Sequence, residues 1–378
     1  MAITTTDHSV PHTSTVPANE GQKVELFVRE HDGTPPGSPA NRKAVLMLHG
    51  RSVPVLAGYD LQHTSYGWAE AIAQAGYDVF MMDLQGSGRS PRPRMEDPCN
   101  VNPKQQTAVT PPLSGPRTPS YPFVLTNSQS DQDELGTVVD YIRSTRNVSK
   151  VAFIGWSAAA FAMGPYAIKN SGKVESLFLL APIFPPLGPS NPPTLPAAGF
   201  PTHVQTRSGL DQAWQNELKC TDQREPGMLD VVWSALMDQD PIGRTWGKLT
   251  PSGQPAGASR FRNFVTWGWN STTAGQGGIL GGSVPVLIVH GEHDQTANTP
   301  PPSPGPALDF HVPALYDAIT GSHKLLVTVK CAGHSMPWEV QHKNLHNLSK
   351  HWLMHTMVDG KTEGRFEMDE NGNISPAP

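Results

Sequence analysis

The sequence predicts an α/β protein, with a mainly parallel central sheet flanked by helices and a mostly helical cap inserted after the sixth strand. Two observations favour this fold class. Nearly continuous apolar runs, such as "KAVLMLHG" (43–50) and "KVAFIGWS" (150–157), are typical of strands buried on both faces of a parallel sheet. Segments with helical spacing alternate with these runs, which is the order that builds such a sheet.

Each predicted element has its own local signal. The alternating pattern of "KVELFVRE" (23–30) indicates a strand. The helix at 65–76 ends in a glycine that suits a C-cap. The helix at 128–147 has acidic residues at its start and basic residues in its last turn, as the helix dipole favours. The same patterns predict further strands at 77–86, 174–182, 284–294 and 324–334, and helices at 158–170, 311–320 and 337–355.

The regular alternation of strands and helices stops between residues 183 and 284, which predicts an inserted cap. Inside this tryptophan-rich block, helices are expected near 209–220, 226–240 and 259–268. The predicted domain organisation consists of a flexible N-terminal arm (1–22), an α/β core (23–182 plus 285–360), the cap (183–284) and a C-terminal tail (361–378).

The segment 91–125 is rich in proline and has no periodic pattern. Unpatterned loops of this length are unusual in compact domains, and they tend to be functional or mobile. We expect this segment to lie opposite the cap and to border the entrance of the active site.

Composition narrows the class of protein. The chain has 378 residues and a net charge of −5, which argues against a general nucleic-acid binder. No apolar run approaches the length of a membrane helix. The N-terminus carries no secretory signal pattern, so a cytoplasmic location is the default expectation. The expected partner is a small-molecule substrate, and the oligomeric state is left open.

The three cysteines, Cys99, Cys220 and Cys331, lie far apart in the sequence. Their number and spacing suggest neither a disulfide framework nor a metal site, and at most one disulfide can form. The residues His290, Glu292, His293 and Asp294 resemble a metal-binding cluster, but alternation along an extended segment points neighbouring side chains to opposite sides. We therefore expect no metal and no cofactor.

Three residue types suited to nucleophilic catalysis follow three predicted strands. Ser157 ends the segment 150–157, and Asp294 and His334 end the two later segments, 284–294 and 324–334. In a parallel sheet, reactive residues collect just beyond the carboxyl ends of the strands. A serine hydroxyl is a poor nucleophile unless an imidazole accepts its proton and a carboxylate orients that imidazole. The order Ser, Asp, His along the chain is the one that accompanies a nucleophile elbow.

Five segments together resemble the α/β-hydrolase superfamily, over roughly residues 40–182 and 283–355. The elbow G-x-S-x-G appears as "GWSAA", with alanine in place of its last glycine. "VLMLHG" followed by arginine resembles the family's oxyanion strand and loop, and "DLQGSGRS" resembles its D-x-x-G-x-G-x-S turn. "VPVLIVHGEHD" and "AGHSMPWE" resemble the segments that carry the acid and the histidine.

The resemblance implies that Ser157 is the nucleophile, His334 the general base and Asp294 the acid that orients it, with Glu292 as the alternative acid. It also implies an oxyanion hole built from the backbone N–H groups of Arg51 and Ala158. Ser52 is a possible substitute for the first of these donors and a possible substrate contact. His49 is expected to order the oxyanion loop, and Gly86 and Gly88 are expected to form a turn without binding phosphate.

The tryptophans have two interpretations. Those of the cap either pack its interior or line an apolar substrate pocket, and we name Trp214 and Trp233 as the candidates for the pocket. Trp156, directly before the nucleophile, either lines the pocket or supports the elbow from behind.

The predicted function is that of a serine hydrolase that cleaves an ester, a lactone or a related acyl bond of a small, largely apolar substrate. The same residues also serve C–C bond hydrolysis of a diketone, amide cleavage and acyl transfer. A non-catalytic ligand-binding protein on the same fold is a further, less favoured alternative. Epoxide hydrolases and haloalkane dehalogenases are disfavoured, because their nucleophile is an aspartate and this elbow carries Ser157.

Overall fold

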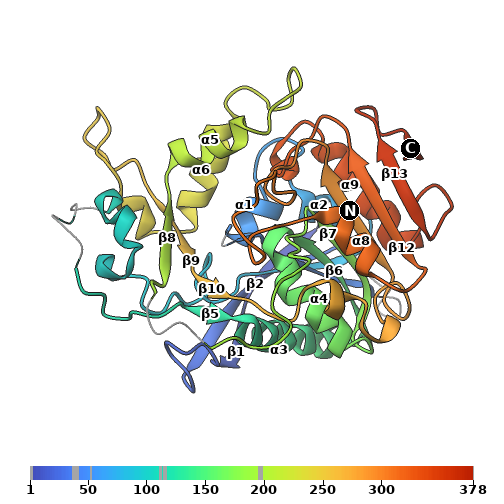
Figure 1. Cartoon of the computed structure of the whole chain (residues 1–378), viewed down its shortest axis with the longest axis horizontal. Coiled ribbons are helices and arrows are strands. Elements are labelled where there is room, and N and C mark those ends of the chain that lie inside the picture. Colours follow the sequence, from blue (N-terminus) through green and yellow to red (C-terminus); the bar gives the residue numbers. More distant parts are fainter. Residues whose placement is uncertain are drawn as a thin grey trace.

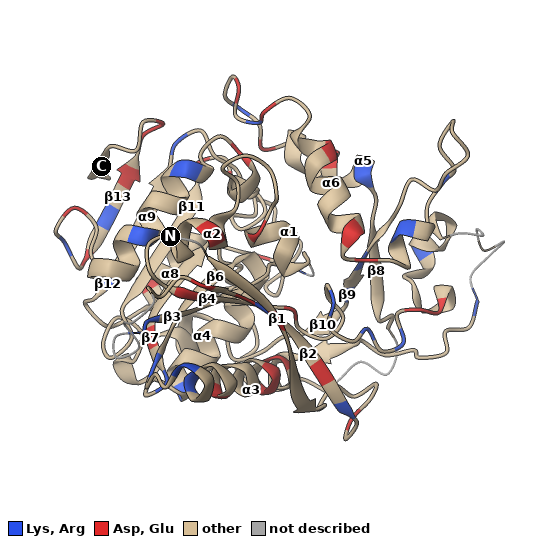
Figure 2. Cartoon of the chain, turned by 180° about the vertical axis from the view of Figure 1, so that it is seen from behind, with Lys and Arg blue, Asp and Glu red and all other residues tan. Residues whose placement is uncertain are grey.

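The computed structural model describes residues 3–35, 42–51, 53–109, 113, 117–194 and 199–377. Ser52, a candidate substrate contact and oxyanion donor, lies outside these ranges. Lys and Arg residues are interspersed with Asp and Glu residues over the core and the cap (Figure 2). Among the described residues, no helix is long and apolar enough to cross a membrane.

A ten-stranded sheet forms the centre of the molecule, in the order β1-β2-β4-β3-β6-β7-β11-β12-β13-β14 (Figure 1). The strands from β4 to β13 in this order run parallel, whereas β1, β2 and β14 each pair antiparallel with a neighbour. The strand bounds are β1 Thr4–Thr13, β2 Lys23–Asp32, β3 Ala44–Leu48, β4 Asp78–Met82, β6 Val151–Trp156, β7 Val174–Leu180, β11 Val286–Gly291, β12 Lys324–Val329, β13 Gly364–Met368 and β14 Ile374–Pro376. The mainly parallel sheet is confirmed, and the cap follows β7, the sixth strand of this sheet along the chain.

Helices cover both faces of the sheet, so every side chain of β3, β4, β6 and β11 is buried. The helices α3 and α4 pack against each other on one face, and α2 packs against α9 on the other. The bounds of the core helices are α1 Val55–Tyr59, α2 Trp68–Ala73, α3 Ser128–Arg146, α4 Ala160–Lys169, α8 Val312–Ala318 and α9 His342–His355. The continuous apolar runs that the sequence shows are therefore explained by burial from two sides.

The N-terminal residues do not form the flexible arm that we expected. Residues Thr4–Thr13 form β1, which pairs with β2 along its whole length. Val10 and His12 point into the protein, while most other side chains of β1 are exposed. A strand with so few apolar residues gives a weak hydrophobic signal, and its backbone pairs with β2 in the sheet.

The C-terminal residues are also part of the sheet, and the predicted tail is wrong as a description of residues 361–378. β13 pairs parallel with β12, and β14 folds back antiparallel on β13. Phe366 and Met368 are buried against the core. The core therefore extends beyond residue 360.

The cap lies beside the carboxyl ends of the strands and mixes helices with strands (Figure 1). The predicted helices near 209–220 and 226–240 correspond to α5 Arg207–Gln215 and α6 Met228–Asp238. The helix predicted at 259–268 is wrong, because β9 Ser259–Arg262 pairs with β8 Thr202–Gln205. Arg260 and Arg262 of β9 are buried in ion pairs with Asp240 and Asp131, an arrangement that an extended strand provides by pointing both side chains the same way.

The described residues of the proline-rich segment 91–125 pack with the cap and do not lie opposite it. The N–H of Asn102 donates to the carbonyl of Thr202 on β8 at 2.9 Å, and the Gln105 side chain donates to the carbonyl of Val204 at 2.8 Å. Its described residues form two short 3₁₀ helices, Pro98–Asn100 and Pro103–Ala108, and the strand β5 Thr126–Asn127 that follows it pairs with β10 Phe264–Val265. The expected position was wrong because sequence alone does not show which surface a loop packs on.

The chain returns to the core earlier than residue 284. Trp269 is buried, and its indole N–H donates to the carbonyl of Ile183 at 3.1 Å. Its ring fills the space beside Gly164 of α4, where an added Cβ would come within 2.3 Å of the ring. The short helix α7 Ser271–Ala274 then packs against α4 and α8.

The pairing of β1 generates a test of the corrected N-terminus. We expect Val10→Asp to lower the free energy of unfolding by at least about 2 kcal/mol, because it places a carboxylate in an apolar environment. Ser9→Asp, at an exposed position of the same strand, should change it by less than about 0.5 kcal/mol. Urea unfolding measures both values, and equal stability of the two variants would contradict a docked β1.

Candidate active site

Ser157 lies at the sharp turn between β6 and α4. Its φ of 59° is in the left-handed region, which costs a residue with a side chain about 1–2 kcal/mol. The turn is tight because Gly155 has no side chain: an added Cβ would lie 2.8 Å from the sulfur of Met163 and 3.2 Å from the Cβ of Ala159. The alanine that replaces the usual last glycine of the elbow therefore packs against the open face of Gly155.

The loop after β3 approaches the same serine. A Cβ added to Gly50 would lie 3.1 Å from the Cβ of Ser157, so a side chain at position 50 would crowd the serine. Arg51 follows in the chain on one side of the serine, and Ala158 follows Ser157 at the start of the helical turn. Their role as oxyanion donors stays a prediction that this placement supports.

His49 ties the loop to the turn after β4, as expected. Its Nδ1 donates to the carbonyl of Gly50, and its Nε2 accepts from the N–H of Leu84 at 3.3 Å. Complete burial lowers the pKa of His49 to about 3, so the imidazole is neutral and both bonds are made at neutral pH. Gly88, with a φ of 48°, lies against the carboxylate of Asp83, which accepts from nearby backbone N–H groups. These contacts support a structural turn.

The structure brings the three candidate residues together. The Nε2 atom of His334 lies 2.9 Å from the Oγ of Ser157. The Nδ1 atom of the same ring lies 3.1 Å from each carboxylate oxygen of Asp294. The Asp294 side chain is fully buried, and its Oδ1 also accepts from the N–H of Ala297 at 2.8 Å. Glu292, the alternative acid, binds Lys330 instead.

Charges around His334 set its protonation behaviour. Burial by itself would lower the pKa of the imidazole, but the carboxylates of Asp294, Glu217 and Glu339 outweigh burial and raise its pKa above the usual 6.5. A raised pKa strengthens the ring as a proton acceptor for the serine hydroxyl. Burial also raises the pKa of Glu339 to about 7.

The sequence model of the α/β hydrolase fold matches residues 43–339. The chain belongs to this family. No curated protein sequence is similar enough to this chain to count as a relative.

Solved structures with the same fold include a serine hydrolase from the polyaromatic hydrocarbon-degrading bacterium Cycloclasticus zankles. It is 14% identical, with a TM-score of 0.51, and the match covers 95% of this chain and 100% of that one. The carboxylesterase CesB from Bacillus subtilis is 11% identical, with a TM-score of 0.51 and coverage of 95% of this chain and 93% of that one. At these identities the likeness shows the fold.

A cavity of about 240 Å³ opens beside Ser157. Its walls come from the oxyanion loop, the cap and the loop that carries His334. The lining residues are Gly50, Arg51, Val53, Trp156, Ser157, Gln205, Leu210, Ala213, Trp214, Glu217, Leu236, Phe261, Thr296, His334, Ser335 and Trp338. No described residue of 91–125 is among them.

The three candidate tryptophans have different positions. Trp214 lines the pocket and donates its indole N–H to Glu339 at 2.9 Å. Trp156 also lines the pocket, and its N–H donates to the carbonyl of His334 at 3.0 Å, so it supports the histidine loop as well. Trp233 is absent from the pocket lining, because its N–H binds the carbonyl of Ala256 inside the cap. The prediction of Trp233 as a substrate contact is therefore wrong.

Glu217 is a residue of the site that sequence reasoning missed. It comes from the cap, is 3% exposed and lines the pocket. One of its carboxylate oxygens accepts from the N–H of His334 at 2.7 Å, and the other accepts from the N–H groups of Gln295 and Thr296 at 3.0 Å each. No local pattern around residue 217 signals this role, since its partners lie far away in the sequence.

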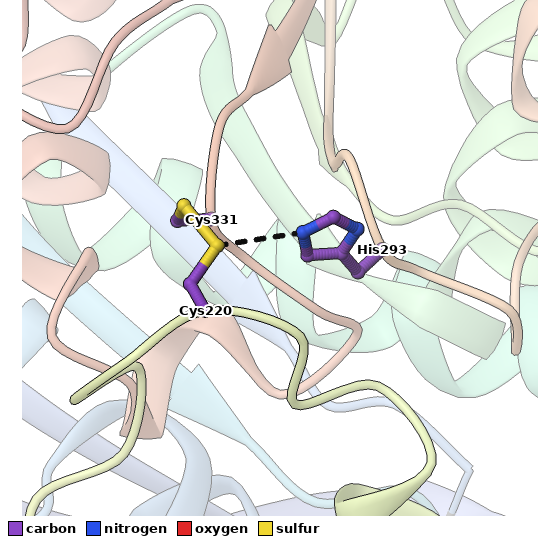
Figure 3. A group of neighbouring side chains, drawn as sticks. All are labelled: Cys220, His293 and Cys331. Atoms are coloured by element: carbon purple, nitrogen blue, oxygen red, sulfur yellow. Dashed lines mark hydrogen bonds between the residues drawn. A yellow bond between two sulfur atoms is a disulfide. The ribbon is translucent and has the colours of Figure 1, made fainter.

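The metal-like cluster of the sequence is divided between different partners. His290 bonds to the carbonyl of Gly291 and lies near Thr328, whereas Asp294 faces His334. His293 lies instead beside a disulfide between Cys220 and Cys331, with its Nε2 3.5 Å from the Cys220 sulfur (Figure 3). Sulfurs bonded to each other are not thiolate ligands, so these residues do not offer a metal site in this state.

The backbone of Ser157 predicts an unusual order of stabilities. Ser157→Gly should unfold with a free energy about 1 kcal/mol higher than Ser157→Ala, because only glycine adopts a φ of 59° without strain. At Ser144, an exposed position inside α3, the glycine variant should instead be about 1 kcal/mol less stable than the alanine variant. Urea unfolding of the four variants measures both differences. The same order at both positions would contradict a strained elbow.

Proposed function

We propose that this hydrolase cleaves an ester, a lactone or a related acyl bond of a small, largely apolar substrate through an acyl-enzyme. The observation that carries the proposal is the continuous hydrogen-bond path from Ser157 through His334 to Asp294. This path has the geometry that a catalytic triad needs, and it opens into a pocket.

In the proposed reaction, the Oγ of Ser157 attacks the substrate carbonyl while its proton moves to Nε2 of His334. The Asp294 carboxylate holds the imidazole in the tautomer with a proton on Nδ1 and stabilises the charged ring. His334 then gives the proton to the leaving alcohol, which leaves the acyl group on the serine. A water molecule, deprotonated by His334, attacks this ester and releases the acid.

The negative charge on the attacked oxygen needs N–H donors. We assign the N–H of Arg51 and the N–H of Ala158 to this role. Gly50, directly before Arg51, lies against Ser157, and Ala158 lies in the helical turn that leads into α4. The positive end of the helix dipole adds to their effect.

The pocket supports a small acyl group. Its volume of about 240 Å³ lies below the usual range for drug-sized ligands. Val53, Leu210, Leu236 and Phe261 give it apolar walls, and Trp214 and Trp156 add aromatic surface. These residues favour an apolar acyl group over a sugar or a nucleotide.

Covalent labelling tests the nucleophile. A fluorophosphonate should label the folded wild-type protein at Ser157, and Ser157→Ala should lose labelling together with nearly all turnover of p-nitrophenyl esters. Peptide mapping by mass spectrometry identifies the labelled residue. An unlabelled Ser157 in folded protein would favour a ligand-binding protein, and turnover of diketones or amides above that of esters and lactones would favour the alternative chemistries.

The raised pKa of His334 predicts the acid limb of the pH profile. The imidazole acts as a base only when neutral, so kcat/KM should rise with pH through a value above 6.5. Asp294→Asn removes the carboxylate that contributes most to raising this pKa, so the limb should move to lower pH while the rate falls by several orders of magnitude. Steady-state kinetics with a non-ionising ester measure both effects. An acid limb at the same pH in Asp294→Asn as in the wild type would argue against the pairing of Asp294 with His334.

A further inference from the structure

The cap reaches the loop that carries His334 through one short segment, residues 214–223. Trp214 and Gln223, at its two ends, donate to different oxygens of Glu339 at 2.9 and 3.1 Å. The carbonyl of Gln223 also accepts from the N–H of Val340 at 3.1 Å. The segment is therefore hydrogen-bonded to residues 339 and 340, five and six residues after His334.

Glu217, in the middle of this segment, joins two loops of the core. Its Oε2 accepts from the backbone N–H of His334. Its Oε1 accepts from the N–H of Gln295 and from the N–H and hydroxyl of Thr296, directly after Asp294. One carboxylate thus fixes the backbone of the base relative to the backbone of the acid, and buried charge-assisted hydrogen bonds of this kind are among the stronger ones.

The disulfide closes this arrangement covalently. Cys220 lies three residues after Glu217, and Cys331 lies three residues before His334. Figure 3 shows the disulfide. Together with the hydrogen bond from the N–H of His334 to Glu217, it closes one small ring that joins residues 217–220 of the cap to residues 331–334 of the core. Within that ring, Glu217 has little freedom to move away from His334.

We infer that Glu217 is a positioning residue for His334, supplied by the cap and held in place by the Cys220–Cys331 disulfide. It rests on the proposed function, since His334 is taken as the base. Glu217 makes no bond to a reacting atom. It holds the imidazole at the distance from Ser157 and Asp294 that proton transfer requires, and its charge adds to those of Asp294 and Glu339, which also face the ring.

The variant Glu217→Gln separates this role from packing. Glutamine has nearly the same shape, but only one of its two terminal atoms accepts hydrogen bonds. If its oxygen keeps the three bonds to Gln295 and Thr296, its amide group faces the N–H of His334, so the bond to the base is lost. The negative charge is lost as well.

We expect Glu217→Gln to lower kcat/KM for a p-nitrophenyl ester by about 10- to 100-fold, as small misplacements of reacting groups do. Its acid limb should move to lower pH, because a carboxylate that raises the pKa of His334 has gone. Asp222→Asn removes a charge from an exposed position of the same segment, and it should change neither kcat/KM nor the pH of the acid limb. Circular dichroism and fluorophosphonate titration of active sites confirm that each variant is folded.

The disulfide is tested by a double-mutant cycle. The double variant Cys220→Ser with Cys331→Ser should lower kcat/KM by only about 2- to 10-fold. The loss is small because the hydrogen bonds from Trp214 and Gln223 to Glu339 remain. Adding Glu217→Gln to this variant should lower kcat/KM by a smaller factor than it does in the wild type, since both changes act through the same contact. Fully multiplicative losses would overturn the disulfide's role.

Two outcomes keep this inference distinct from the proposed function. If the wild-type protein hydrolyses esters and Glu217→Gln matches it in rate and acid limb, Glu217 is not a positioning residue, while the serine mechanism stands. If the wild-type protein neither reacts with the fluorophosphonate nor hydrolyses any ester, the proposed function itself fails.

Discussion

The left-handed backbone at Ser157 is the constraint on which the rest of the site depends. It turns the chain from the buried strand β6 into the short helical turn that leads to α4, and it leaves the hydroxyl at the end of the sheet. The neighbours must then be small: Gly155 and Ala159 pack face to face behind the turn, and Gly50 packs in front of it. The strain is sustained because β6 is paired on both sides and buried on both faces.

The parallel sheet delivers the partners of this serine. β11 and β12 are adjacent and in register, so the loops after them emerge side by side. Asp294 and His334 come from these two loops, and Ser157 comes from the strand next to β7. A register shift between β11 and β12 would separate the acid from the base even if every residue were kept, so the hydrogen-bond path is a property of the sheet as much as of the three side chains.

The sequence predicted those parts of the fold and site that local patterns encode. Buried strands appear as apolar runs, and Ser157, Asp294 and His334 each follow one, so their convergence could be expected. β1 was missed because its exposed polar residues conceal its pairing with β2. Glu217 was missed for a related reason: its partner His334 is 117 residues away, and only the folded cap brings them together. The position of segment 91–125 likewise depends on packing against β8, which no local pattern shows.

The disulfide also bears on where and how the protein is made. Disulfides persist in oxidising compartments and are rare in the cytosol, so Cys220–Cys331 weighs against the cytoplasmic location expected from the sequence, which stays a prediction. The bond spans 111 residues and joins the cap to the core. Chains produced in a reducing cytosol would lack this covalent link between cap and core. Two preparations of identical sequence would then differ in activity according to the redox conditions of the host.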